Sequence, residues 1–270
     1  MNKKIPFVLL ALILSTGSLF PAFAFAQSLP DSTRSKIDQL FAKWNDTTAP
    51  GCAAGIVRGD QLVYARGFGL ADLENKTPNT PATVFYMCSL SKQFSGYAIA
   101  LLVNQGKIKL DEDIHVYLPW MNDFGKKITV SNLLNHTSGL RDDIGLAQFY
   151  GLGGDGMLTQ DLAVQMLKRQ RTLNFNPGEK FSYSNSNYVL LAEMVRTVMG
   201  QSFKSFTDSA IFRPLGMTAS AFADDHSQLI PNRALSYGKD GEAWHNAVQN
   251  VYTLGDGGLF TSGNDGKMGD

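Results

Sequence analysis

The sequence predicts an α+β fold in which a helical lobe lies beside an antiparallel sheet. Near the start, two apolar runs around a Gly-Asp pair indicate a β-hairpin. In the middle, from Ser89 to Phe212, apolar residues recur mostly at helical spacing and indicate several helices. The last part, Ala221 to Asp270, is rich in Gly, Asp and Asn with few periodic runs, which favours loops and short strands.

The first residues have the order of a secretory leader. Two lysines precede a short apolar run from Phe7 to Leu14, and small residues follow as far as Ala26. This order is typical of a signal peptide, and the run is too short and too interrupted to span a bilayer. We therefore expect removal of residues 1–26, a mature chain of residues 27–270, and an exported location, either periplasmic or secreted. We expect no membrane span in the mature chain, because it has no second apolar stretch of sufficient length.

The composition gives no sign of a nucleic-acid or lipid partner. The chain carries 24 basic and 24 acidic residues, and loss of the leader removes Lys3 and Lys4 but no acid. A balance so close to neutral, with no basic run, gives no attraction to nucleic acid or acidic lipid. Two cysteines, Cys52 and Cys88, are too few for a disulfide framework. Export permits a bridge between them, but their apolar surroundings favour buried free thiols.

The first expected elements are a helix and a hairpin. The segment SKIDQLFAKW indicates an amphipathic helix with Asp31 or Ser32 as its N-cap. Its apolar residues share one face: Ile37, Leu40, Phe41 and Trp44. The apolar runs from Cys52 to Phe68 then flank Gly59-Asp60, a pair that suits a two-residue loop, and they predict two antiparallel strands.

A helix that starts at Ser89 and ends at Gly106 is expected in the interior. Apolar residues cover nearly every face of it, which is typical of a helix surrounded by protein. Lys92 is the only charged residue between Thr77 and Gly106. Further helices are expected over ITVSNLLNHTSGL, capped by Ser131; LTQDLAVQMLKRQ; SNYVLLAEMVRTVMG, closed by Gly200; and SFKSFTDSAIF.

Ser89 and Lys92 are the first candidates for chemistry. A serine hydroxyl needs a neighbouring base to become a nucleophile, and on a helix that starts at Ser89 the Lys92 side chain lies one turn on. Burial disfavours the charged ammonium and so favours the neutral amine that can accept a proton. The helix start also places backbone N–H dipoles near a developing negative charge. The alternative is an N-cap serine and a solvent-facing lysine, because Ser-x-x-Lys also arises by chance, as at Ser236-Tyr237-Gly238-Lys239.

Tyr183 and Asn185 are the second pair of candidates. Asn176-Pro177-Gly178-Glu179 indicates a turn, which leaves Tyr183 in a loop just before the helix that starts near Ser186. The Tyr183 phenol can transfer a proton, and the Asn185 amide can orient it. A packed aromatic residue and a helix cap are the alternative interpretation.

Other catalytic arrangements are disfavoured. Gly-x-Ser-x-Gly, the nucleophile elbow of α/β-hydrolases, is absent. The histidines lack the spacing of a zinc site, and we expect no metal and no other cofactor; they are His115, His136, His226 and His245. His136 and Ser138 could form a Ser-His pair, but a structural loop is favoured, because nothing presents Ser138 from a strand turn or a helix start.

Five segments, in order, resemble the serine β-lactamase and penicillin-binding protein superfamily: FYMCSLSKQF, ITVSNLLNHTSGL, NPGEKFSYSNSNYVLLAEMV, FRPLGM and GDGGLFTSGND. Tyr183-Ser184-Asn185 stands where that superfamily has its second motif. A tyrosine at its first position is similar to the branch of class C β-lactamases, D-alanyl-D-alanine carboxypeptidases and related esterases. The resemblance runs from about Ser32 to Asp265, and it implies the β-lactamase/transpeptidase-like fold.

The resemblance also implies a mechanism. Ser89 would be the acylated nucleophile, with its backbone N–H as one of two oxyanion donors. Lys92 would be its proton partner, and Tyr183 the acid and base that also protonates the leaving group. Asn185 would hydrogen-bond the substrate amide or the Lys92 side chain. The reaction would be acyl transfer from an amide, β-lactam or ester, with a small molecule or a cell-wall peptide as substrate and no cofactor.

One motif of the superfamily has no counterpart here. Lys267-Met268-Gly269 imitates its Lys-Thr-Gly motif but follows GGLFTSGND too closely. We therefore expect a domain that is incomplete at its C-terminus, a sheet without its last strands, and a hairpin at Cys52 to Phe68 with an open apolar edge. We also expect the purified chain to be poorly soluble or inactive. A truncated pseudoenzyme or ligand-binding remnant is accordingly the alternative to an active hydrolase.

Overall fold

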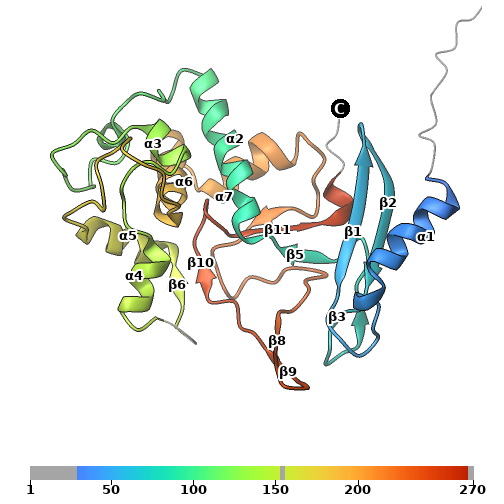
Figure 1. Cartoon of the computed structure of the whole chain (residues 1–270). Coiled ribbons are helices and arrows are strands. Elements are labelled where there is room, and N and C mark those ends of the chain that lie inside the picture. The colour runs from blue at the N-terminus through green and yellow to red at the C-terminus, as the bar shows by residue number, and fades with distance from the viewer. Residues whose placement is uncertain (1–28, 153–155, 267–270) are drawn as a thin grey trace, which may run out of the picture.

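The computed structural model describes residues 29–152 and 156–266. The expected signal peptide and the Lys267-Met268-Gly269 segment lie outside these residues. Most helices gather on one side of the molecule and most strands on the other, with α2 (Ser91–Asn104) between them (Figure 1). This arrangement confirms the predicted α+β fold. No helix within the described ranges is long and apolar enough to cross a membrane.

The N-terminal part contains α1 (Asp31–Leu40) and the predicted hairpin. The hairpin strands, β1 (Cys52–Arg58) and β2 (Gln61–Phe68), pair antiparallel around the Gly59-Asp60 turn. Gly59 has a φ of +61°, a conformation that such a tight turn needs. In the part of the chain that the structure describes, these strands form a two-stranded sheet of their own, and Val57 on β1 is exposed.

The N-cap expected for α1 is wrong. Its N-cap is Pro30, without a side-chain hydrogen bond, rather than Asp31 or Ser32. Its apolar face is partly covered, because Phe41 stacks on Phe68 whereas Leu40 is 73% exposed. Ile37 packs against a small cluster that includes two residues of β2. The helix therefore packs against β2 of the hairpin.

The interior helix α2 turns polar side chains inward. A 3₁₀ turn over Cys88–Leu90 precedes it, so Ser89 lies just before the α-helix rather than at its first position. The buried residues of α2 are Ser91, Lys92, Ser95, Ala98, Ile99 and Leu102. The expectation of an apolar helix buried on every side is therefore wrong, and Tyr97 is exposed. Polar residues face inward because they meet backbone carbonyls; Ser95 Oγ donates to the Gly255 carbonyl at 2.7 Å.

The longest helix, α6, forms the centre of the helical lobe. It begins at Asn185, and Gly200 ends it with a φ of +64°, as predicted. It is buried along most of its length and packs against α2, α3, α5 and α7. The helices of the lobe are α3 (Val130–Leu134), α4 (Asp143–Phe149), α5 (Gln160–Arg169), α6 (Asn185–Met199) and α7 (Phe203–Thr207), which continues as a π-helix over Asp208–Phe212.

Side-chain caps set the helix starts in this lobe. For α3 the predicted Ser131 cap is wrong, because Thr129 and Asn132 form a capping box instead. The predicted segment LTQDLAVQMLKRQ forms α5 behind a Thr159 cap. The sequence pattern gave no indication of α4, which Asp142 caps by accepting a hydrogen bond from the third residue of the helix.

The strands form several small sheets. β11 (Leu259–Ser262) lies between β5 (Val84–Tyr86) and β7 (Ala221–Phe222), and all three are antiparallel. The other pairs are β3 (Leu70–Asp72) with β4 (Thr77–Pro78), β6 (Leu158–Thr159) with β10 (Val251–Tyr252), and β8 (Tyr237–Asp240) with β9 (Ala243–Asn246). Loops and short strands therefore make up most of residues 221–266, as predicted, and the loop before β11 lies against α2.

Candidate active site

The candidate nucleophile Ser89 lines a cavity of about 370 Å³. Strand β5 ends at Tyr86, and the 3₁₀ turn that follows exposes the Ser89 side chain to solvent. Cys88 in this turn has a φ of +47°, a costly conformation that recurs at functional sites. Its thiol is free and exposed, and Cys52 is free and half-buried, so the expectation of buried thiols is wrong.

Three oxygen atoms surround the Lys92 amine. Nζ lies 3.2 Å from Ser89 Oγ, 2.8 Å from Asn185 Oδ1 and 2.8 Å from the Asp256 carbonyl oxygen. Only 9% of Lys92 is exposed, so these contacts are largely shielded from water. The amide oxygen and the carbonyl cannot donate, so each of them fixes one Lys92 N–H. In the neutral amine the third position is a lone pair directed at Ser89, which is the geometry of a general base.

Tyr183 completes the hydrogen-bonded group around Ser89. Its hydroxyl lies 2.8 Å from Ser89 Oγ, and Lys92 Nζ lies 4.9 Å from the centre of its ring. It occupies the loop just before α6, as predicted, and is 47% exposed. The structure thus brings together all four predicted site residues: Ser89, Lys92, Tyr183 and Asn185. Tyr183 is placed to pass a proton between Ser89 and a molecule in the cavity.

His136 packs against the Tyr183 ring, with the ring centres 4.5 Å apart. Its Nδ1 accepts a hydrogen bond from the Ser184 N–H at 3.2 Å, so this nitrogen carries no proton. Burial is the main cause that lowers the pKa of His136, and it favours the neutral ring. Ser138 donates its hydrogen bond to α6 instead of to His136. The pair is therefore structural, as the sequence favoured, and His136 supports Tyr183.

Asp142 is a site residue that the sequence analysis missed. Its Oδ1 accepts hydrogen bonds from the Asn185 backbone N–H at 2.6 Å and from Asn185 Nδ2 at 3.0 Å. A carboxylate can only accept, so Asp142 holds Nδ2 on its own side and leaves the Asn185 Oδ1 for Lys92. Asp142 therefore decides which end of the Asn185 amide faces the Lys92 amine.

Replacing Asp142 with alanine is expected to lower the rate of Ser89 acylation by about tenfold or more, because the Asn185 amide is then free to rotate. Loss of the α4 cap should cost about 1 kcal/mol of stability as well. Ser202→Ala is the matched control, since Ser202 caps α7 and lines a different cavity. Burst kinetics with a p-nitrophenyl ester measure acylation, and urea unfolding measures stability. Equal acylation rates in the two variants would contradict the role of Asp142.

Two buried carboxyl groups lie behind the Lys92 site. Asp143 and Asp256 are 0% and 3% exposed. Within the described ranges, Asp143 Oδ2 and Asp256 Oδ1 have no hydrogen-bond partner. Burial, followed by the charge of Asp256, raises the pKa of Asp143, and burial likewise raises the pKa of Asp256. Folding therefore favours the protonated form of Asp143.

Replacing Asp143 with asparagine is expected to stabilise the protein at pH 8. The unfolded carboxyl ionises near its ordinary pKa of 3.8, whereas the folded pKa is raised. Stability is therefore fully present below the unfolded pKa and is lost as the pH rises through the folded pKa. The amide avoids this loss, which amounts to roughly 1.4 kcal/mol per pKa unit. Urea unfolding from pH 4 to 8 measures the free energy of unfolding. The difference between Asp143→Asn and wild type should grow as the pH rises, whereas the exposed control Asp161→Asn should differ from wild type by a constant amount. A constant difference for Asp143→Asn would contradict the raised pKa of Asp143.

The second Ser-x-x-Lys lacks the contacts of the first. Lys239 on β8 pairs with Glu242 at 3.1 Å. Ser236 lines the same cavity as Ser89, but within the described chain no hydrogen bond links it to Lys239. Among the residues that the structure describes, no three His, Cys, Asp or Glu side chains are grouped to hold a metal ion. The hydrogen-bonded group at Ser89 is therefore the candidate site.

Known proteins resemble the chain in sequence and in structure. The model of a family described as Beta-lactamase matches residues 36–267. A D-aminopeptidase from Gluconobacter oxydans is 30% identical over 217 residues, 80% of this chain and 41% of that protein. The octameric penicillin-binding protein homologue from Pyrococcus abyssi has a TM-score of 0.75 and 30% identity, over 88% of this chain and 55% of that chain. The D-amino acid amidase from Ochrobactrum anthropi SV3, in complex with D-phenylalanine, has a TM-score of 0.66 and 25% identity, over 80% and 63%. The chain thus spans about two-fifths of the length of the curated relative.

Proposed function

The chain belongs to the β-lactamase family of serine hydrolases, and from this membership we propose that it hydrolyses amides through an acyl-enzyme on Ser89. One observation carries the proposal: Ser89 Oγ is within hydrogen-bond distance of both Lys92 Nζ and Tyr183 Oη, at 3.2 and 2.8 Å. A nucleophile, a base and a second proton donor thus meet at one exposed oxygen.

The contacts suggest how protons move through the reaction. The neutral Lys92 amine takes the Ser89 proton as Oγ bonds to the substrate carbonyl carbon. Tyr183 gives its proton to the leaving nitrogen as the carbon–nitrogen bond breaks. Water then attacks the ester and returns a proton to Tyr183, and the Lys92 ammonium returns a proton to Ser89 as it leaves. All three side chains end the cycle as they began it.

The proposed substrate class is an amide of a D-amino acid, or a short peptide that begins with one. Relatives of the chain are a D-aminopeptidase and a D-amino acid amidase. The cavity beside Ser89 carries apolar side chains from three segments, among them Ile144, Val248 and Tyr86, which suit an apolar or aromatic substrate side chain. The leader-like order of residues 1–26 supports an exported location, where cell-wall peptides would be within reach.

Release of ammonia from D- and L-phenylalanine amide tests this proposal. The sequence alone predicts an inactive chain, but the contacts at Ser89 lead us to expect that the purified chain hydrolyses the D-form at least about tenfold faster than the L-form, and that Ser89→Ala hydrolyses neither. Turnover of nitrocefin or simple esters, without turnover of either amide, would support the acyl-enzyme mechanism but contradict the proposed D-amino acid substrate. Absence of turnover with every substrate, by a folded monomer of verified mass, would instead support the ligand-binding alternative.

A further inference from the structure

The carbonyl that holds Lys92 belongs to a loop between β10 and β11. Residues 253–258 have no regular secondary structure, and the Asp256 carbonyl accepts from Lys92 Nζ at 2.8 Å. Next to it, the Gly255 carbonyl accepts from Ser95 Oγ at 2.7 Å. Gly255 has a φ of +94°, and a Cβ there would lie 2.3 Å from the Tyr188 carbonyl oxygen. The position of the Asp256 carbonyl therefore depends on the contacts that residues 253–258 make with the neighbouring helices.

Gln160, at the start of α5, contacts the same loop through Leu254. Its Oε1 accepts a hydrogen bond from the Leu254 N–H at 2.9 Å, and its Nε2 donates to Glu193 Oε1 at 2.8 Å. The two ends of the amide thus have opposite roles, which fixes its orientation. Leu254 is only two residues from Asp256, so a shift of the Leu254 amide moves the carbonyl that Lys92 uses.

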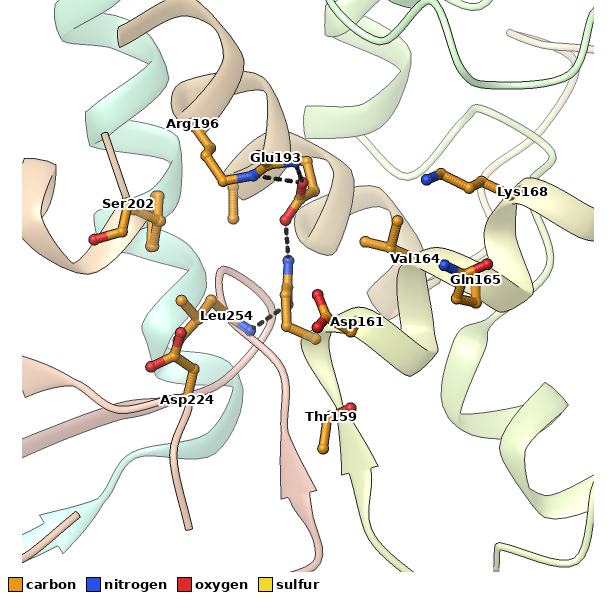
Figure 2. Close-up of a pocket in the computed structure, with 13 residues that line it drawn as sticks. Thr159, Asp161, Val164, Gln165, Lys168, Glu193, Arg196, Ser202, Asp224 and Leu254 are labelled. Carbon is orange, nitrogen blue, oxygen red and sulfur yellow. Dashed lines mark hydrogen bonds and ion pairs between the residues drawn. The ribbon is translucent and has the colours of Figure 1, made fainter. Parts of the chain in front are cut away.

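Glu193 anchors Gln160 to the central helix. It is 5% exposed, and its second oxygen accepts hydrogen bonds from Arg196 Nε at 2.9 Å and Nη2 at 2.6 Å. Figure 2 shows the dashed contacts that run from Arg196 through Glu193 toward Leu254. A buried carboxylate with every oxygen occupied is a rigid acceptor, so the Gln160 amide has a fixed support.

These contacts border a cavity of about 390 Å³ that is distinct from the one at Ser89. The charged groups around it are Glu193 and Arg196 on α6, Asp161 and Lys168 on α5, and Asp224. The cavity leaves open space beside the Gln160 side chain. Loss of the amide would leave the Leu254 N–H to water.

We propose that Gln160 is a positioning residue for Lys92, acting through Leu254 and the Asp256 carbonyl. This role rests on the proposed function of Lys92 as the base for Ser89. It assigns a task to three polar residues, Gln160, Glu193 and Arg196, that have no contact with Ser89 or with the cavity beside it.

Acylation of Ser89 by a p-nitrophenyl ester, followed from pH 5.5 to 9, tests the role with three variants. Gln160→Ala is expected to lower the acylation rate about tenfold at every pH. Gln160→Glu is expected to retain most activity at low pH, where one proton shared with Glu193 preserves both contacts. It should lose activity as the pH rises and the two carboxylates repel. Gln165→Glu is the matched control, because Gln165 lies on the same helix, lines the same cavity and is exposed.

A second measurement does not depend on activity. Hydrogen exchange of the peptide that contains Leu254 should be faster in Gln160→Ala than in wild type, and unchanged in Gln165→Ala. If the ester does not acylate Ser89 in the wild-type chain, the proposed function is rejected. Hydrogen exchange at Leu254 would then still show whether Gln160 holds the loop. A wild-type pH profile in Gln160→Glu, or unchanged exchange at Leu254, would overturn the role of Gln160.

Discussion

Replacing Lys92 with methionine is expected to lower the rate of Ser89 acylation by about three orders of magnitude. Methionine has nearly the same length and keeps the packing of α2, but it has no lone pair that can take the Ser89 proton. The Asp256 carbonyl and the Asn185 amide oxygen also lose their common donor. Stopped-flow acylation with a p-nitrophenyl ester measures the rate, and circular dichroism shows whether the fold is retained.

Lys239→Met is the control for this substitution. Lys239 belongs to the second Ser-x-x-Lys but lies on β8 and pairs with an exposed acid, Glu242. It should keep the wild-type rate. A Lys92→Met protein that folds and acylates within about threefold of wild type would exclude Lys92 as the base.

Replacing Tyr183 with phenylalanine is expected to lower hydrolysis of an amide by about 10²-fold to 10³-fold, and that of a p-nitrophenyl ester by much less. An amine needs a proton as it leaves, whereas p-nitrophenolate does not. The substitution removes only the hydroxyl that lies 2.8 Å from Ser89 Oγ and leaves the ring on His136. The ratio of the two rates in the same preparation measures the effect.

Tyr188→Phe is the matched control for Tyr183→Phe. Its ring also packs on His136, but its hydroxyl donates to the Leu134 carbonyl, away from Ser89. It should leave the ratio of amide to ester hydrolysis unchanged. Equal losses with amide and ester in Tyr183→Phe would mean that the phenol does not protonate the leaving group.

The parts of the fold that could be predicted have local causes. The hairpin follows from the Gly59-Asp60 turn, and the end of α6 follows from Gly200, since each needs only its neighbours in the chain. The four residues that meet at Ser89 also lie in segments whose local patterns could be identified from the sequence. Their meeting could be expected only from the resemblance, because Ser89 and Tyr183 are 94 residues apart.

The N-cap of α3 was predicted wrongly because two nearby residues could both serve as the cap. Thr129 and Ser131 both suit an N-cap, but Thr129 pairs with Asp113 in an isolated bridge that holds it extended. The helix therefore starts after Thr129, and a tertiary contact decides between two equal local candidates. For α1, Pro30 rather than Asp31 or Ser32 precedes the helix, and no side chain caps it.

The residues around Lys92 that could not be predicted act through the backbone or over long distances in the chain. Asp256 offers its carbonyl, so its side chain gives no indication of the contact. Gln160 meets Leu254 across 94 residues. Asp142 and Asp143 are adjacent and look alike in the sequence, yet one is an acceptor for Asn185 and the other is buried with a raised pKa. Only the fold separates their roles.

Peptide mapping by mass spectrometry after incubation with a fluorophosphonate tests the central claim most directly. The wild-type chain should carry one adduct, on Ser89, and Ser89→Ala should carry none. Ser236→Ala should remain labelled, because the lysine of the second Ser-x-x-Lys, Lys239, pairs with Glu242. An unmodified wild-type mass across probes and concentrations, or an adduct on a residue other than Ser89, would contradict the account.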